Sequence, residues 1–111
     1  METSALKKII TDFRDERNWK QFHNPKDLAI SLSLEAAELL EVFQWSANDL
    51  EVIDKREELK EELADVLIYA FHLCDVCDLD AEEIILDKLK KNEKKYPIEK
   101  AYGNKEKYTK L

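Results

Sequence analysis

Two pairs of acidic residues lie inside segments that have the apolar pattern of buried helices. Glu35 and Glu38 form one pair, and Glu62 and Asp65 form the other. Residues three positions apart on a helix are neighbours, about 5 to 6 Å apart, so each pair projects its two carboxylates in the same direction. An ionised carboxylate in a helix core is costly unless a cation or hydrogen bonds compensate it. The four carboxylates together therefore predict a metal site.

The chemistry of these side chains narrows the choice of metal. If the two helices pack antiparallel, the pairs converge into one oxygen-rich site, which suits Mg²⁺ or Mn²⁺. Mg²⁺ commonly keeps waters and takes phosphate oxygens as further ligands, so a phosphate-bearing substrate is the expected partner. A di-iron site is disfavoured. It requires Glu-x-x-His on two helices, and neither His23 nor His72 follows a Glu by three residues.

The structural alternative is that the acidic residues pair with lysine and arginine on neighbouring helices. We favour this interpretation for Glu58 and Glu61, which have lysines nearby in the sequence. We disfavour it for Glu35, whose helix has no basic residue close by, and for Asp65, the only acidic residue in a largely apolar run.

The composition predicts the fold that positions these side chains. One Gly and two Pro, with 44% hydrophobic and 39% charged residues, favour an all-α protein. Apolar periodicity and capping signals predict four helices. They cover about 4–19, 25–44, 55 to at least 74, and 80–94.

The length of 111 residues predicts one undivided domain, residues 1–111, with a basic, irregular tail over about 98–111. Residues 88–111 carry nine Lys and three Glu, and the rest of the chain is acidic, which argues against binding to nucleic acid. We interpret Cys74 and Cys77 as ordinary core or interface residues.

Nothing in the sequence indicates a membrane partner. No segment has the roughly 20 apolar residues that a membrane span needs. The start, Met1-Glu2-Thr3-Ser4, lacks the pattern of a signal peptide. We therefore expect the protein to be cytoplasmic.

Two runs of sequence carry a resemblance to a known family. Residues 33–45 read SLEAAELLEVFQW, and residues 61–69 read EELADVLIY. Together they resemble the MazG-like all-α nucleoside triphosphate pyrophosphohydrolases, and they are especially similar to the dCTP pyrophosphatase branch. The likeness extends to residues 17–23 and to positions 88, 92, 96–97 and 107–109. It implies a four-helix MazG-like bundle.

The resemblance implies Mg²⁺-dependent hydrolysis of a deoxynucleoside triphosphate, dCTP or a modified dCTP, to a nucleoside monophosphate and pyrophosphate in nucleotide-pool sanitation. By position, Glu35, Glu38, Glu62 and Asp65 would be the catalytic metal ligands. Glu38 would also orient and deprotonate the attacking water.

The resemblance implies seven further residues that would bind substrate, and most of them have a structural alternative. Tyr69 would contact the deoxyribose or simply pack in the core. Lys88 and Asn92 would reach the triphosphate or sugar, or be solvated. A base pocket would be formed by Trp19, Phe22, His23 and Trp45. The alternative for Trp19 and Trp45 is that they close the core at helix ends.

The apolar surface that one subunit leaves on its long helices predicts at least a homodimer, and the family resemblance implies dimers paired into a homotetramer. Two other functions stay open from the sequence. One is a non-catalytic helical module that binds a nucleotide or a protein partner, and the other is a structural oligomerisation bundle.

Overall fold

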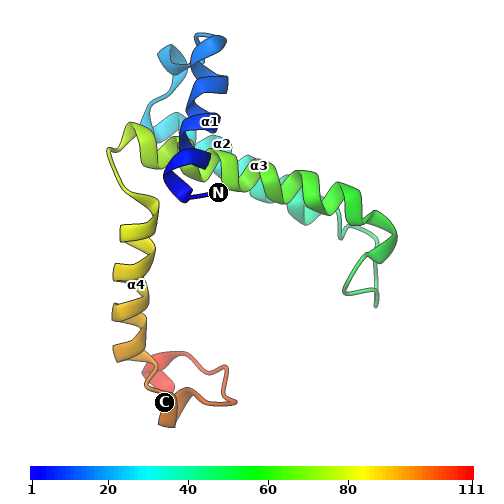
Figure 1. Cartoon of the computed structure of the whole chain (residues 1–111). Coiled ribbons are helices and arrows are strands. Elements are labelled where there is room, and N and C mark those ends of the chain that lie inside the picture. The colour runs from blue at the N-terminus through cyan, green and yellow to red at the C-terminus, as the bar shows by residue number, and fades with distance from the viewer. The chain divides into compact units, whose positions relative to one another are not determined.

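The computed structural model describes all 111 residues, which form helices and turns and no strands (Figure 1). This confirms the all-α prediction. The chain divides into two compact units, Met1–Asp78 and Leu79–Leu111, and each is described by itself. The first unit contains α1, the 3-10 turn η1, α2, the 3-10 turn η2 and α3, over Thr3–Glu16, Trp19–Phe22, Pro25–Glu41, Ile53–Lys55 and Arg56–Val76.

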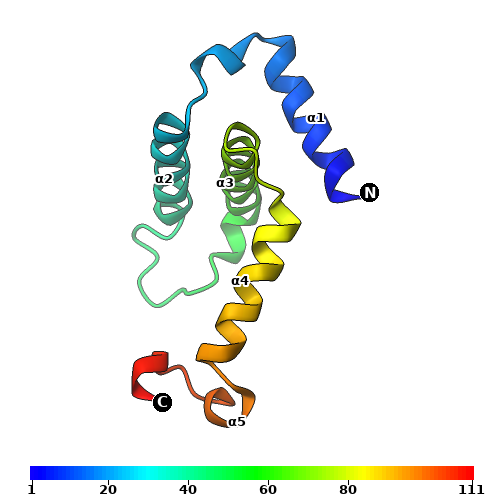
Figure 2. The same cartoon turned by 90° about the vertical axis from the view of Figure 1, so that its left-hand side faces the viewer.

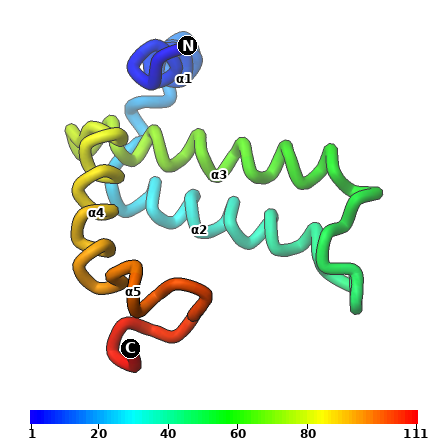
Figure 3. The backbone as a smooth tube through the Cα atoms, turned by 60° about the horizontal axis from the view of Figure 1, so that its bottom comes forward, coloured from blue at the N-terminus to red at the C-terminus, as the bar shows by residue number.

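The pair formed by α2 and α3 is the centre of the first unit. The two helices run alongside each other in opposite directions (Figure 3), and Figure 2 shows the same pair nearly end on. Leu28 on α2 is 2% exposed, and His72 on α3 is 6% exposed. Because the helices are antiparallel, residues near the start of α2 lie beside residues near the end of α3. This register decides which side chains meet.

The start of α2 follows from its capping residues. The Asn24 side chain accepts a hydrogen bond from the backbone N–H of Asp27 at 2.9 Å, and Pro25 occupies the first turn. Both features favour helix initiation. The predicted start is confirmed, but α2 ends at Glu41, a few residues earlier than expected, because the chain turns there and Trp45 takes a positive φ of 67°.

The first predicted helix is too long. α1 ends at Glu16, and Asn18 adopts the left-handed conformation with φ of 54°. Asparagine tolerates this conformation better than most residues because its side chain can bond locally. Trp19 therefore lies in η1, outside α1.

The connection from α2 to α3 turns through Asp49. Its Oδ1 accepts hydrogen bonds from the backbone N–H groups of Glu51 and Val52 at 3.1 and 3.0 Å. This Asx-type turn accompanies the burial of Val52, which is 1% exposed. The third helix then starts at Arg56, next to the predicted start.

A buried ion pair joins α1 to the C-terminal part of α3. Arg14 is 3% exposed, and its Nη1 donates to Asp75 at 2.5 Å while its Nε donates to Asp15 at 2.9 Å. Burial alone would raise the pKa of Asp75, but hydrogen bonding to Arg14 and the charges of Arg14 and two lysines lower it. The cation and its carboxylates therefore compensate each other within the chain.

The second unit contains α4 over Ala81–Lys95, α5 over Ile98–Ala101 and the 3-10 turn η3 over Tyr108–Lys110. Asp80 caps α4 by accepting from the N–H of Glu82 at 2.9 Å, as its position predicted. The tail is more ordered than expected. In place of an irregular 98–111 segment, it contains α5 and η3, and the Tyr108 ring packs against Tyr96 at 5.9 Å between centroids.

The single domain over 1–111 and the four-helix bundle stay predictions, because α4 belongs to the second unit. None of the helices combines the length and the apolar character needed to cross a membrane. Several apolar side chains of the α2–α3 pair are exposed in the isolated chain. They are Ile30, Leu34, Leu40, Leu63, Leu67 and Ile68.

Candidate functional site

The register of α2 and α3 brings the two acidic pairs together. Each of the four residues Glu35, Glu38, Glu62 and Asp65 offers one carboxylate oxygen, and these oxygens all lie within 4.8 Å of one another. Glu38 is exposed, and the other three are partly buried. Four carboxylates drawn from two helices thus share one site.

The pKa values in the cluster are raised because like charges lie close together and are partly shielded from water. Burial is the largest cause that raises the pKa of Glu35, and together with the neighbouring carboxylates of Glu38, Asp65 and Glu62 it brings the value to about 7. The pKa of Glu62 is also raised, first by desolvation and then by the neighbouring carboxylates of Glu38, Asp65 and Glu61. Ionising all four groups is therefore unfavourable without a cation.

No positive side chain compensates the cluster. None of the four carboxylates forms an ion pair with a lysine or arginine. The Oε2 atoms of Glu35 and Glu62 are buried and have no hydrogen-bond partner. Buried polar atoms are normally paired, so these oxygens fit a divalent cation that prefers hard oxygen ligands.

A second carboxylate-rich pocket of about 390 Å³ adjoins the cluster and shares Glu38 and Glu62 with it. Its other acidic residues are Glu41, Glu58 and Glu61. The expected pairing of Glu58 and Glu61 with lysines is wrong for this chain, because neither forms an ion pair and Lys60 pairs with Glu57 instead, at 3.2 Å. A polyanion in this pocket would need accompanying cations.

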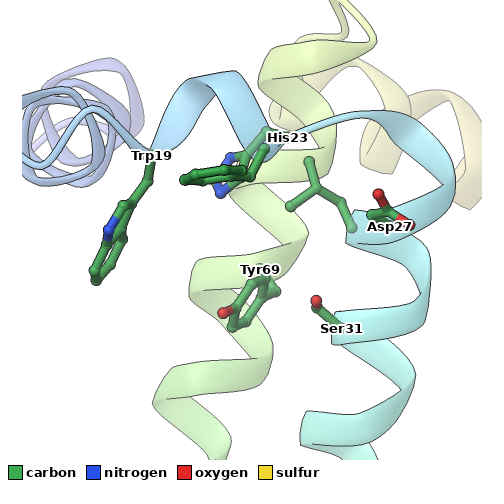
Figure 4. Close-up of a pocket in the computed structure, with 7 residues that line it drawn as sticks. Trp19, His23, Asp27, Ser31 and Tyr69 are labelled. Carbon is green, nitrogen blue, oxygen red and sulfur yellow. The ribbon is translucent and has the colours of Figure 1, made fainter.

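An aromatic pocket of about 300 Å³ lies where η1 meets the start of α2 and the later part of α3. It brings together four residues that the sequence analysis grouped as substrate contacts, namely Trp19, Phe22, His23 and Tyr69. Figure 4 shows His23, which directly follows η1, and Tyr69 on α3 facing the pocket, with Trp19 at its side. The other lining residues are Asp27, Leu28 and Ser31.

Trp45 is not part of this pocket. It follows the C-terminal end of α2, whereas the pocket lies at the N-terminal end, and α2 has 17 residues. A helix of that length extends about 25 Å. Trp45 is 91% exposed. Within one chain it therefore does not complete the base pocket that the sequence predicted, and its contact with a nucleotide stays a prediction.

Lys88 and Asn92 lie one turn apart on α4, in the second unit, with Asn92 half-buried. They share a helix face, as their spacing predicts. Their approach to a triphosphate stays a prediction.

Two imidazoles meet at the pocket: His23 is half-buried and lines it, and His72 is buried behind His23. The rings of His23 and His72 meet edge to face at 4.8 Å, and the His72 ring is 5.9 Å from Tyr69. Burial lowers the pKa of both histidines, and the nearby Arg14 charge lowers it further; the value for His72 is about 4. Both side chains are therefore neutral at pH 7.

Sequence reasoning missed Asp27, Ser31 and His72 at this site. Asp27 and Ser31 precede Glu35 by eight and four residues on α2, so helical spacing alone could have placed them on the carboxylate face. His72 is seven residues after Asp65 on α3, so helical spacing could have placed it on the carboxylate face in the same way. Only the pairing of the helices showed that Asp27 and Ser31 line a pocket and that the His72 ring lies against two of its other lining residues.

Comparison with known proteins places the chain in a family. Residues 30–111 match the model of the MazG-like family, and the chain belongs to that family.

Curated relatives with the name dCTP pyrophosphatase 1 are similar over most of the chain. The protein from Mus musculus is 37% identical over 112 residues, which cover 96% of this chain and 65% of the relative. The protein from Homo sapiens is 36% identical over 111 residues, with the same two coverages. The chain thus spans about two thirds of the length of the relatives it matches.

A solved structure shares the fold. The crystal structure of a pyrophosphatase from Archaeoglobus fulgidus matches with a TM-score of 0.77 and 49% sequence identity. The match covers 85% of this chain and 91% of the other. The fold is therefore similar to that of a solved pyrophosphatase.

Proposed function

We propose that this protein hydrolyses a deoxynucleoside triphosphate, dCTP or a modified dCTP, between the α and β phosphates, giving a nucleoside monophosphate and pyrophosphate for nucleotide-pool sanitation. Membership of the MazG-like family supports the reaction class. Similarity to proteins named dCTP pyrophosphatase supports the substrate class. The observation that carries the proposal is the cluster of four carboxylates with no cation from the chain.

The four carboxylates would hold Mg²⁺, or Mn²⁺ in its place. When bound, the ion would neutralise phosphate charge, orient the triphosphate and lower the pKa of a bound water. The orphaned oxygens of Glu35 and Glu62 support their assignment as ligands. Glu38 is the exposed member of the cluster. It is therefore the carboxylate best able to contact the attacking water, orient it and accept its proton.

The aromatic pocket would take the base. Trp19 and Phe22 offer flat apolar faces for stacking. His23, being neutral at pH 7, offers both a donor and an acceptor to a base edge. Tyr69 stands between this pocket and the carboxylates and would contact the deoxyribose. Lys88 and Asn92 would bind the triphosphate or the sugar.

The decisive experiment compares two aspartate variants. Asp65→Asn removes one charge from the cluster, and Asp78→Asn is a matched control at an exposed position whose φ of 54° suits asparagine. With dCTP and Mg²⁺, the wild type and Asp78→Asn should release pyrophosphate and no orthophosphate. Asp65→Asn should lose at least about 100-fold in rate, since metal-ion stabilisation is worth several kcal/mol.

A thermal measurement accompanies the assay. Mg²⁺ should raise the melting temperature of the wild type and of Asp78→Asn, because it binds the native state only, and should leave Asp65→Asn unchanged. Nucleotide binding without turnover would instead favour a non-catalytic module. Indifference to both metal and nucleotide would favour a structural bundle.

The exposed apolar faces of α2 and α3 support assembly as a homodimer or homotetramer. Burial of such faces between subunits is favourable at about 25 cal/mol per Å². Light scattering at micromolar concentration should give at least the dimer mass, and a monomer would contradict this part of the proposal. Residence in the cytoplasm stays a prediction.

A further inference from the structure

Ser31 occupies a distinct position between the aromatic pocket and the carboxylate cluster. On α2 it precedes Glu35 by four residues, and on α3 Tyr69 follows Asp65 by four residues. Four residues correspond to about 6 Å along a helix. Because Ser31 and Tyr69 line the same pocket, they form one layer of the α2–α3 pair, one helical turn from the layer of Glu35 and Asp65.

The order of these layers matches the order of groups in a nucleotide. Stacking side chains for a base come first, with Trp19 and His23. The carboxylates that would hold the metal come last. The intervening layer therefore coincides with the pentose, which joins a base to its 5′-phosphate. In a deoxynucleotide the 3′-hydroxyl is the only free hydroxyl of that pentose.

The Ser31 hydroxyl is available to a ligand. Serine and threonine inside helices often bond to a carbonyl one turn earlier, and Thr11 on α1 does so, donating to the carbonyl of Lys8 at 3.1 Å. Ser31 makes no hydrogen bond with the chain at either its donor or its acceptor side. Figure 4 shows its side chain directed from α2 toward the Tyr69 side of the pocket.

We infer that Ser31 is a specificity-determining residue that hydrogen-bonds the 3′-hydroxyl of the substrate sugar, with the Tyr69 ring forming the opposite wall. The inference rests on the proposed function and adds sugar recognition to it. A hydroxyl group suits this role because it donates and accepts, as the 3′-hydroxyl does. A sugar that lacks this hydroxyl forfeits the contact.

The test combines a change in the protein, at Ser31, with a change in the substrate, the removal of its 3′-hydroxyl. The wild type, Ser31→Ala and Ser33→Ala are each assayed for pyrophosphate release from dCTP and from 2′,3′-dideoxy-CTP with Mg²⁺. Ser33 is the matched control, since it lies two residues further on the same helix, is exposed and does not line the pocket. Equilibrium affinities for both nucleotides are measured by calorimetry in parallel.

Ser31→Ala should lower kcat/KM for dCTP by about five- to tenfold, as for one lost hydrogen bond, and leave the dideoxy substrate unchanged. Ser33→Ala should behave as the wild type on both. Equal losses on both substrates would show a structural role for Ser31, and no loss on either would show no contact; each result overturns the inference. If the wild type releases no pyrophosphate, the proposed function fails, and the calorimetric comparison of the two nucleotides still decides the role of Ser31.

Discussion

Two carboxylate centres lie on the same helix, α3, and the chain supplies a compensating positive charge to only one of them. Asp75 meets the buried Arg14 from α1, and its pKa is lowered. Asp65, ten residues earlier, lies with three glutamates and no cation, and the pKa of its neighbour Glu35 is raised to about 7.

This difference separates a structural carboxylate from one that is available for chemistry. At Asp75 the fold supplies the compensating charge, so the ion pair joins α1 to α3 without any ligand. At Asp65 the fold supplies further negative charge, and compensation has to come from outside the chain. The first centre should therefore govern stability, and the second should govern response to metal.

The largest effect on stability is expected from breaking the structural centre. Asp75→Asn leaves the buried Arg14 charge without its main partner, and such changes cost about 3 to 5 kcal/mol. Urea unfolding monitored by circular dichroism measures the loss. Asp15→Asn is the control, because Asp15 is the more exposed partner of Arg14, and its loss should cost little, as for exposed ion pairs in general. Equal effects of the two variants would refute the distinction.

The next effect concerns His72, which lies between the two centres on α3. Its pKa is lowered to about 4 by burial, by His23 and by Arg14, while Asp75 and Asp15 oppose this. The unfolded chain therefore binds a proton below about pH 6.5 that the folded chain does not bind until about pH 4. Folding stability should fall over this window, by up to about 3 kcal/mol.

The comparison of His72→Phe with the wild type isolates this contribution. Phenylalanine keeps a ring against His23 and Tyr69 and cannot be protonated. The unfolding free energy of the variant should lose less on acidification from pH 6.5 to pH 4. Parallel pH profiles for the two proteins would show that His72 does not titrate in this way.

A smaller effect is the pH dependence of metal binding. With the pKa of Glu35 at about 7, Mg²⁺ has to displace a proton below that pH. The apparent affinity should fall about tenfold between pH 8 and pH 6. Calorimetry in two buffers of different ionisation enthalpy would detect the released proton. Constant affinity over the same range would contradict the raised pKa.

The smallest effect is a gain in stability for the metal-free protein. The pKa of Glu35 is higher in the folded than in the unfolded chain, so its ionisation opposes folding from about pH 4.5 upward and fully above pH 7. Glu35→Gln removes that cost and should stabilise the metal-free chain at pH 8 by about 1 kcal/mol. Glu51→Gln, at an exposed position, should be neutral. A loss of stability in Glu35→Gln would show that its carboxylate is already compensated.

Local signals predicted the helices well and their ends less well. Asn24 and Asp80 cap α2 and α4 as predicted, because capping depends on a few adjacent residues. The end of α1 was wrong because Asn18 takes a left-handed conformation that periodicity does not reveal. The ordered turns in 98–111 were missed because they accompany ring packing between Tyr96 and Tyr108, which are far apart in the sequence.

By itself, the sequence determined the all-α class, the acidic pairs and the family, since helical spacing, composition and motif identity are local properties of the chain. Tertiary structure decided which side chains share a site. The antiparallel register of α2 and α3 placed the four carboxylates together, put Ser31 and His72 beside the aromatic pocket, and left Trp45 beyond the other end of α2. Contacts between helices depend on how their apolar faces pack. They are not a local property of the sequence, so the spacing of residues along the chain does not reveal them.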